Sequence, residues 1–190
     1  MSNIDNVKRY KEARQNLIKD TEENNVDFLS GKKYIFVSLL AIIINMFFNM
    51  VIGFVFFVYY DIPIEANNIF MFVMPLLLSF IFARFIYFYG TKLFVFLFIV
   101  GGAASLLFSF INDSFLYLNT ESILLNITNI YAIIGSVIQI TLGVFLLLNK
   151  KCRTYISLIS DIDKKVKTEY IHNLGSTSSF SKANTEKEHS

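Results

Sequence analysis

The fold of this chain is constrained most strongly by four long apolar runs that alternate with short polar segments. They cover residues 34–60, 69–89, 92–111 and 127–149. Arg84 is the one charged side chain in their interiors. A helix needs about 20 apolar residues to cross the ~30 Å hydrocarbon core of a bilayer, and each run is of that order. The sequence therefore predicts an all-α, polytopic membrane protein whose transmembrane domain, residues 34–149, has four helices.

The positive charges predict how these spans are oriented. Of the 17 lysines and arginines, seven precede Tyr34, two bracket the turn at Gly90 and eight follow Leu148. In the other two connections, residues 61–68 and 112–126, every charged side chain is acidic. Loops rich in lysine and arginine stay on the cytoplasmic side. We therefore expect a multi-pass protein of the inner (plasma) membrane with both termini in the cytoplasm.

Amphipathic segments flank the four spans on the cytoplasmic side. Residues 1–33 are mostly polar, with apolar side chains such as Val7 and Tyr10 at about helical spacing. Residues 150–174 repeat this pattern and predict a second amphipathic helix. Residues 175–190 are rich in serine and threonine, and this composition predicts a disordered tail.

The second amphipathic helix presents a narrow apolar face. Its members are Ile159, Ile162, Val166 and Tyr170. A helix of about 20 residues is marginal alone, so another copy of the chain, the N-terminal helix or a partner protein must cover this face. The opposite face carries charges of both signs, whereas a helix lying on a membrane favours a basic polar face. We interpret the four residues as a docking face for a cytoplasmic protein partner.

A seam of small and polar residues runs through the apolar spans. Its candidate functional members are Asn45, Asn49, Ser105, Ser136 and Gln139. At 100° per residue, Asn45 and Asn49 share one face of the first span. The seam has two interpretations: hydrogen bonds and close approach between packed helices, or the lining of a hydrated pathway or pore. No aspartate or glutamate lies inside a span, which disfavours an ion-coupled transporter.

Two single residues in the second span stand out. Pro75 removes a backbone donor and crowds the preceding turn, so we predict a helix kink there. Arg84 lies six residues before Gly90, about 9 Å along a helix. It is interpreted either as an anchor whose charge reaches the interface or as a gating or lipid-headgroup contact.

The sequence contains no recognisable catalytic motif. Cys152 is the one cysteine, which excludes an intrachain disulfide. The two histidines, His172 and His189, lie near the C-terminus without partners at metal-ligand spacing. We therefore expect a protein that is not an enzyme, uses no cofactor or metal and does not bind nucleic acid directly.

The residue usage and topology together suggest a functional context. Phenylalanine, tyrosine, isoleucine, asparagine and lysine are abundant and tryptophan is absent, a usage typical of A/T-rich bacterial genes. Chain length, four spans, cytoplasmic ends and this usage resemble the membrane subunits of bacterial phage-defence systems of the Kiwa type. The resemblance rests on size and topology, and it implies a sensor or pore-forming role beside a soluble partner.

These features predict a small integral membrane protein that forms homo-oligomers in the lipid bilayer. It would act as a membrane sensor, pore or signalling subunit with a cytoplasmic partner, in antiviral (phage) defence. One alternative is a bacteriocin immunity protein that intercepts toxin helices within the bilayer, although such a protein has little use for amphipathic helices at both ends. A second alternative is an accessory subunit of a transporter or channel.

Overall fold

The computed structural model describes residues 3–61, 63, 66–111 and 123–187 and contains six helices in this part of the chain. They are α1 (Asn3–Asn24), α2 (Val26–Tyr59), α3 (Ala66–Tyr89), α4 (Lys92–Ile111), α5 (Ile123–Leu148) and α6 (Lys150–Lys187). The described residues include no strand. The predicted all-α class is therefore confirmed.

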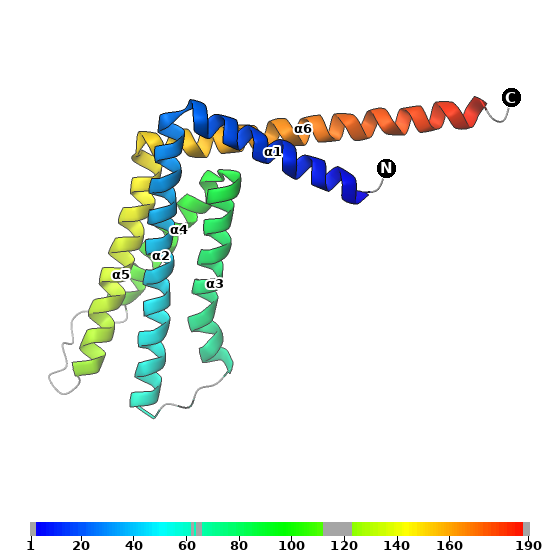
Figure 1. The fold of residues 1–190 in the computed structure, drawn as a ribbon. Helices are drawn as coiled ribbons and strands as arrows, with labels where there is room; N and C mark the ends of the chain where they lie inside the picture. The colour runs from blue at the N-terminus through cyan, green and yellow to red at the C-terminus, as the bar shows by residue number, and fades with distance from the viewer. Residues whose placement is uncertain (1–2, 62, 64–65, 112–122, 188–190) are drawn as a thin grey trace.

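The helices form two parts that meet at one end of the molecule (Figure 1). Helices α2 to α5 run up and down as a bundle in which α2 contacts α3, α3 contacts α4, α4 contacts α5 and α5 returns to α2. Helices α1 and α6 cross the end of this bundle side by side, and we refer to these two helices as the cap. Helix α2 ends and α3 begins at the opposite end of the bundle (Figure 1). Of the two predicted acidic connections, 61–68 and 112–126, residues 62, 64–65 and 112–122 lie outside the described part.

The junction between the N-terminal segment and the first apolar run lies earlier than predicted. The expected boundary is residue 34, but α1 ends at Asn24 and α2 already begins at Val26. Asn25 separates them with an extended backbone, and its side chain accepts a hydrogen bond of 2.9 Å from the amide of Phe28. This contact caps the exposed amides at the start of α2. The local capping signal thus decides the boundary, and the polar first turns of α2 belong to the long apolar helix.

Two other turns are fixed by local chemistry. Gly90 adopts a φ of 62°, a left-handed conformation that glycine takes without steric cost, and it ends α3 two residues before α4 begins. Asn149 separates α5 from α6, and its side-chain oxygen accepts from the amides of Lys151 and Cys152 at 3.0 and 3.2 Å. The predicted turn at Gly90 is therefore present.

The densest core lies where the cap meets the bundle. The fully buried apolar side chains are Phe28, Ile35, Ile42, Ile86, Val95, Leu146 and Cys152. Phe28 at the start of α2 stacks on Tyr155 of α6, with ring centroids 4.8 Å apart. Each of the four bundle helices contributes the end that faces the cap, together with the first turns of α6. The bundle is thus held most tightly at the cap end.

The C-terminal helix is longer than predicted. Helix α6 continues to Lys187, past the predicted end at residue 174 and through most of the segment expected to be disordered. The segment contains no proline, and the single Gly175 costs only about 1 kcal/mol relative to alanine in a helix. The second half of α6 projects beyond α1 and away from the bundle (Figure 1).

Two helical stretches are long and apolar enough to cross a membrane: Val26–Tyr59 and Ile127–Leu148. Two more, Val73–Tyr89 and Lys92–Leu107, are apolar but shorter within the described side chains. The finding supports an association with a membrane, and two of the four predicted spans meet the criterion of length.

Candidate functional site

The first amide of the predicted seam joins two helices of the bundle. Asn45 of α2 is 6% exposed, and its side-chain nitrogen donates to the backbone carbonyl of Gly135 in α5 at 3.1 Å. A side chain at position 135 would crowd this amide, because a Cβ atom there would lie 3.0 Å from the Asn45 oxygen. The small residue in α5 and the amide in α2 are therefore complementary.

The second amide of α2 makes a different contact. Asn49 donates to the carbonyl of Asn45, one turn earlier in the same helix, at 3.1 Å. It therefore does not join two helices, although the sequence places it on the same face as Asn45. Asn49 also lines the cavity described below.

Helix α5 is joined to α4 by two hydrogen bonds that involve the other three members of the seam. Gln139 is 6% exposed and donates to the carbonyl of Phe98 at 2.8 Å. The hydroxyls of Ser136 and Ser105 are hydrogen-bonded at 3.0 Å. The structure therefore brings the five predicted residues together around α5, with Asn45 on one side and Gln139, Ser136 and Ser105 on the other.

A cavity of about 460 Å³ lies beside this seam, between α2, α3, α4 and α5. Asn49, Ser105, Ser136 and Gln139 contribute to its lining, whereas Asn45 does not. The remaining lining is largely apolar and comes from all four bundle helices. Its volume falls within the range of about 300–1,000 Å³ that is usual for small-molecule sites.

The cavity has a rim of exposed residues on α3 and α4. Pro75 and Leu78 of α3 and Gly101 and Ser105 of α4 are exposed and also line the cavity. Helices α3 and α4 share buried core residues near Gly90, including Ile86 and Val95. The cavity therefore opens sideways, between α3 and α4, farther from the turn.

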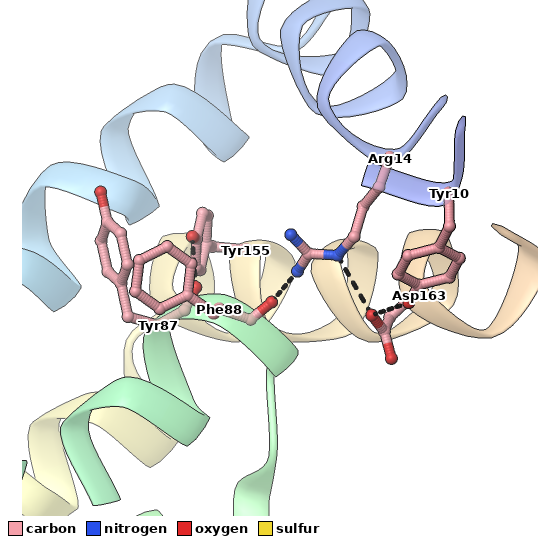
Figure 2. A network of polar contacts seen from close by, with 6 residues as sticks. All are labelled: Tyr10, Arg14, Tyr87, Phe88, Tyr155 and Asp163. Carbon is pink, nitrogen blue, oxygen red and sulfur yellow. Dashed lines mark hydrogen bonds and ion pairs between the residues drawn. The ribbon is translucent and has the colours of Figure 1, made fainter. Parts of the chain in front are cut away.

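A second cluster of polar contacts joins the two cap helices to the end of α3 (Figure 2). Arg14 of α1 donates through Nε to Asp163 of α6 at 3.1 Å and through Nη2 to the carbonyl of Phe88, near the end of α3. Tyr10 of α1 donates to the same Asp163 oxygen at 3.0 Å. We call Tyr10, Arg14, Asp163 and the Phe88 carbonyl the clasp. It joins α1, α3 and α6 at one point.

The ion pair of the clasp is partly shielded from water and lies beside an aromatic ring. The Arg14 and Asp163 side chains are 14% and 23% exposed, and the guanidinium lies 5.6 Å from the ring centroid of Tyr89. Burial, followed by the hydrogen bond to Asp163, raises the pKa of Tyr10. Because hydrogen bonds to charged groups are stronger than neutral ones, this contact holds the end of α3 firmly to the cap.

Helix α6 touches the same end of α3 at a second place. Tyr155 donates to the carbonyl of Tyr87 at 2.7 Å (Figure 2). Burial is the main cause that raises the pKa of Tyr155. A Cβ atom on Gly90 would lie 2.2 Å from the carbonyl oxygen of Ile156, so α6 passes directly against the turn between α3 and α4.

The predicted docking face of α6 is largely covered by the chain itself. Ile159 and Val166 are each 2% exposed, and Ile162 is half-buried. The side chain of Tyr170 lies outside the described residues. The sequence leaves open whether another copy, the N-terminal helix or a partner covers this face. Ile159 is covered by the chain's own helices, because it packs in the common core. Ile159 and Val166 are therefore not free to dock a partner, and a docking role for Ile162 and Tyr170 stays a prediction.

The two remaining candidate residues lie on α3. Arg84 is exposed on the bundle surface, one turn and a half before Gly90. Pro75 lies inside α3, and its carbonyl accepts a hydrogen bond of 2.8 Å from Ser79. The helix continues through Pro75, and a kink at this residue stays a prediction.

The clasp is the feature that sequence reasoning missed. Arg14 follows Tyr10 by four residues, and Asp163 follows Ile159 by four, so each charge lies on the apolar face of its helix. A charge on the buried face of an amphipathic helix requires a partner. That rule identifies both residues as unusual, but the pairing itself depends on how the two helices lie.

The described residues contain no group of three or more histidine, cysteine, aspartate or glutamate side chains that could hold a metal ion. No family model, curated protein or solved structure matches the chain. The assignment of a function therefore rests on the cavity, the clasp and the sequence.

Proposed function

We propose that the chain is a four-span integral membrane protein and that it is not an enzyme. Helices α3 and α4 have 24 and 20 residues, close to the length needed for the ~30 Å hydrocarbon core. Large apolar side chains face outward on all four helices, among them Phe36 of α2, Phe80 of α3, Phe96 of α4 and Val137 of α5, each 48–55% exposed. A water-soluble monomer rarely exposes so much contiguous apolar surface.

In this proposal the cap lies in the cytoplasm of the host cell. The cap helices, the first turns of α2 and the turn at Gly90 carry the lysines and arginines of the chain other than Arg84, which is exposed near that end. The positive-inside rule then places the cap and both termini on the cytoplasmic side of the inner membrane. Arg84 is placed to contact lipid headgroups there.

The function that we propose is signal transfer between the membrane bundle and the cap. The clasp is the observation that carries this proposal. Through it, the guanidinium of a single α1 residue bonds both to α6 and to the carbonyl end of α3. A displacement of α3 relative to the other spans changes the position of the Phe88 carbonyl and therefore the contacts of Arg14 and Asp163. Because α6 projects past α1 (Figure 1), a second copy of the chain or a soluble partner can approach it without displacing the bundle.

The resemblance to Kiwa-type membrane subunits supports antiviral defence as the process that uses this signal. A cap that packs on the spans and projects past them supports a relay more than an immunity protein, which acts within the bilayer. The cavity has no described carboxylate in its lining, and this supports a sensor more than an ion-coupled transporter.

Cysteine labelling of intact cells tests the membrane placement. Cys152 is fully buried, so single cysteines introduced at the exposed positions Asp61, Lys11 and Thr168 act as reporters. A membrane-impermeant maleimide is expected to label D61C from outside the cell and to label K11C and T168C only after permeabilisation. Labelling of T168C in intact cells would contradict the orientation.

A plaque assay with matched variants tests the relay. Cells that express the chain with its neighbouring genes are challenged with phage, and membrane levels are measured by immunoblot. Arg14→Met keeps the aliphatic stem but removes the three-way contact, so we expect protection to be lost at normal membrane levels. Lys8→Met is the control, because within the described part of the chain Lys8 pairs only with the exposed Glu12, at 3.9 Å. Full protection by Arg14→Met would refute the relay, and an unprotected wild type would refute the defence role.

A further inference from the structure

We propose that the bundle cavity binds one lipophilic molecule that carries a hydroxyl group and that enters sideways from the hydrocarbon core. This inference rests on the membrane placement proposed above and adds the chemical class of the signal. It is carried by three observations: the lateral opening, the apolar lining and two amide oxygens to which no described residue donates.

The opening lies at the depth of the lipid chains. Pro75 is 15 residues before Gly90 and Gly101 is 11 residues after it, which corresponds to about 22 Å and about 16 Å of helix. The hydrocarbon core is ~30 Å thick, so the rim between α3 and α4 faces the middle of the bilayer. A molecule that enters here comes from the lipid phase and not from water.

Two amide groups lining the cavity have unused acceptors. Gln139 donates its nitrogen to Phe98 and Asn49 donates to Asn45, and within the described part of the chain nothing donates to their side-chain oxygens. Gln139 is 94% buried, because its exposed fraction is 6%. A buried carbonyl without a donor is costly. The Gln139 oxygen therefore favours an occupant that supplies a hydrogen-bond donor, and the half-buried Asn49 oxygen offers a second acceptor.

The remaining lining defines the rest of the ligand. Apolar side chains from α2, α3 and α4, including Met46, Leu78 and Leu97, surround the amides, so the body of the molecule must be apolar. No carboxylate or basic group lies among the lining residues, which disfavours a charged head. An uncharged long-chain alcohol satisfies these conditions, with its hydroxyl at the amides and its chain extending through the rim.

Photolabelling tests this site directly. The full chain is reconstituted in vesicles of phosphatidylethanolamine and phosphatidylglycerol and irradiated with a diazirine-bearing long-chain primary alcohol. Peptides labelled by the probe are identified by mass spectrometry. The methyl ether of the same alcohol keeps the apolar body and an acceptor but has no donor, so it is the matched control probe.

We expect the alcohol to label peptides that line the cavity, and the ether to label them about threefold to tenfold less, the effect of one hydrogen bond. Asn49→Leu removes one acceptor without removing a bond between helices, and a similar decrease is expected for the alcohol. Equal labelling by both probes in wild type would refute the hydroxyl assignment, whether or not any variant folds.

A cavity-filling variant locates the site. A Cβ atom on Gly101 lies 3.4 Å from the Gln139 amide nitrogen, so Gly101→Leu places its side chain in the cavity. We expect it to abolish labelling, whereas Val100→Leu, on the outward face at 44% exposure, leaves labelling unchanged. Wild-type labelling of Gly101→Leu would overturn the cavity as the site. Failed topology mapping with intact labelling would instead refute the proposed orientation alone.

Discussion

The substitution Gly31→Ala tests the closest approach between the bundle and the cap. Gly31 lies in the second turn of α2, where a Cβ atom would be 2.1 Å from the carbonyl oxygen and 2.8 Å from the carbonyl carbon of Lys151 in α6. Ordinary contact begins near 3.4 Å, so the two backbones must separate by about 1 Å. Backbone atoms have no alternative rotamer, and overpacking of this kind costs about 1–3 kcal/mol.

The single natural cysteine reports this separation. Cys152 follows Lys151, is fully buried, and burial raises its pKa to about 11, so the folded protein presents a protected thiol. Maleimide then reacts through local opening of α6, and its rate follows the population of the open form. A cost of about 1–3 kcal/mol predicts labelling about fivefold to 150-fold faster in Gly31→Ala than in wild type.

Gly101→Ala is the matched control for this experiment. It makes the same change in a helix interior, and it carries the same gain in helix propensity of about 1 kcal/mol. A Cβ atom there meets its nearest neighbour at 3.4 Å, which is ordinary contact. If Cys152 is as protected in Gly31→Ala as in Gly101→Ala, the close packing of α2 on α6 is wrong.

Three further predictions concern the seam, the cap and pH. Asn45→Leu removes the bond to α5 and is expected to lower the free energy of unfolding, measured by detergent titration, by about 0.6–1.7 kcal/mol. Asn49→Leu is expected to have little effect, because its bond lies within α2. Equal losses of unfolding free energy in the two variants would contradict their separate roles. Tyr155→Phe deletes the 2.7 Å bond to the Tyr87 carbonyl, which costs about 1 kcal/mol and lowers the Tm measured by circular dichroism by about 2–4 °C; an unchanged Tm would show that this bond does not stabilise the cap. As the pH rises from 9 to about 11, the unfolded chain releases the Cys152 proton that the folded chain keeps. The stability that this burial contributes is therefore fully present below pH 9 and decreases through this window. Cys152→Ala is expected to remove that part of the decrease, and identical profiles of stability against pH for wild type and variant would contradict the burial effect.

The sequence by itself determines the helical architecture, for reasons that act locally. The apolar runs are too long and too continuous for β-strands. The turns at Asn25 and Asn149 depend on side-chain capping and the turn at Gly90 on a left-handed glycine, all of which are local features of the sequence. The uneven distribution of lysine and arginine likewise predicts an orientation without any structure. The helix through residues 175–187 is the exception, because polar composition alone does not prevent a helix.

The hydrogen-bond partners of the polar seam are not determined by local sequence. Helical periodicity places Asn45 and Asn49 on one face, but it does not say which neighbour that face meets. Only the bundle geometry decides that Asn45 bonds to α5 while Asn49 lines a cavity. Both side chains lie against Gly135, but the Asn45 amide donates to its carbonyl in α5 whereas the Asn49 amide donates within α2.

The cap also depends on tertiary structure. Periodicity identifies the apolar face of α6, yet Ile159 is buried against the chain's own helices instead of remaining exposed for a partner. The clasp requires Arg14, Phe88 and Asp163 to meet although they are 74 to 149 residues apart. The amphipathic pattern of α6 indicates that its apolar face must be buried, and only the packing of the whole chain decides which residues bury it.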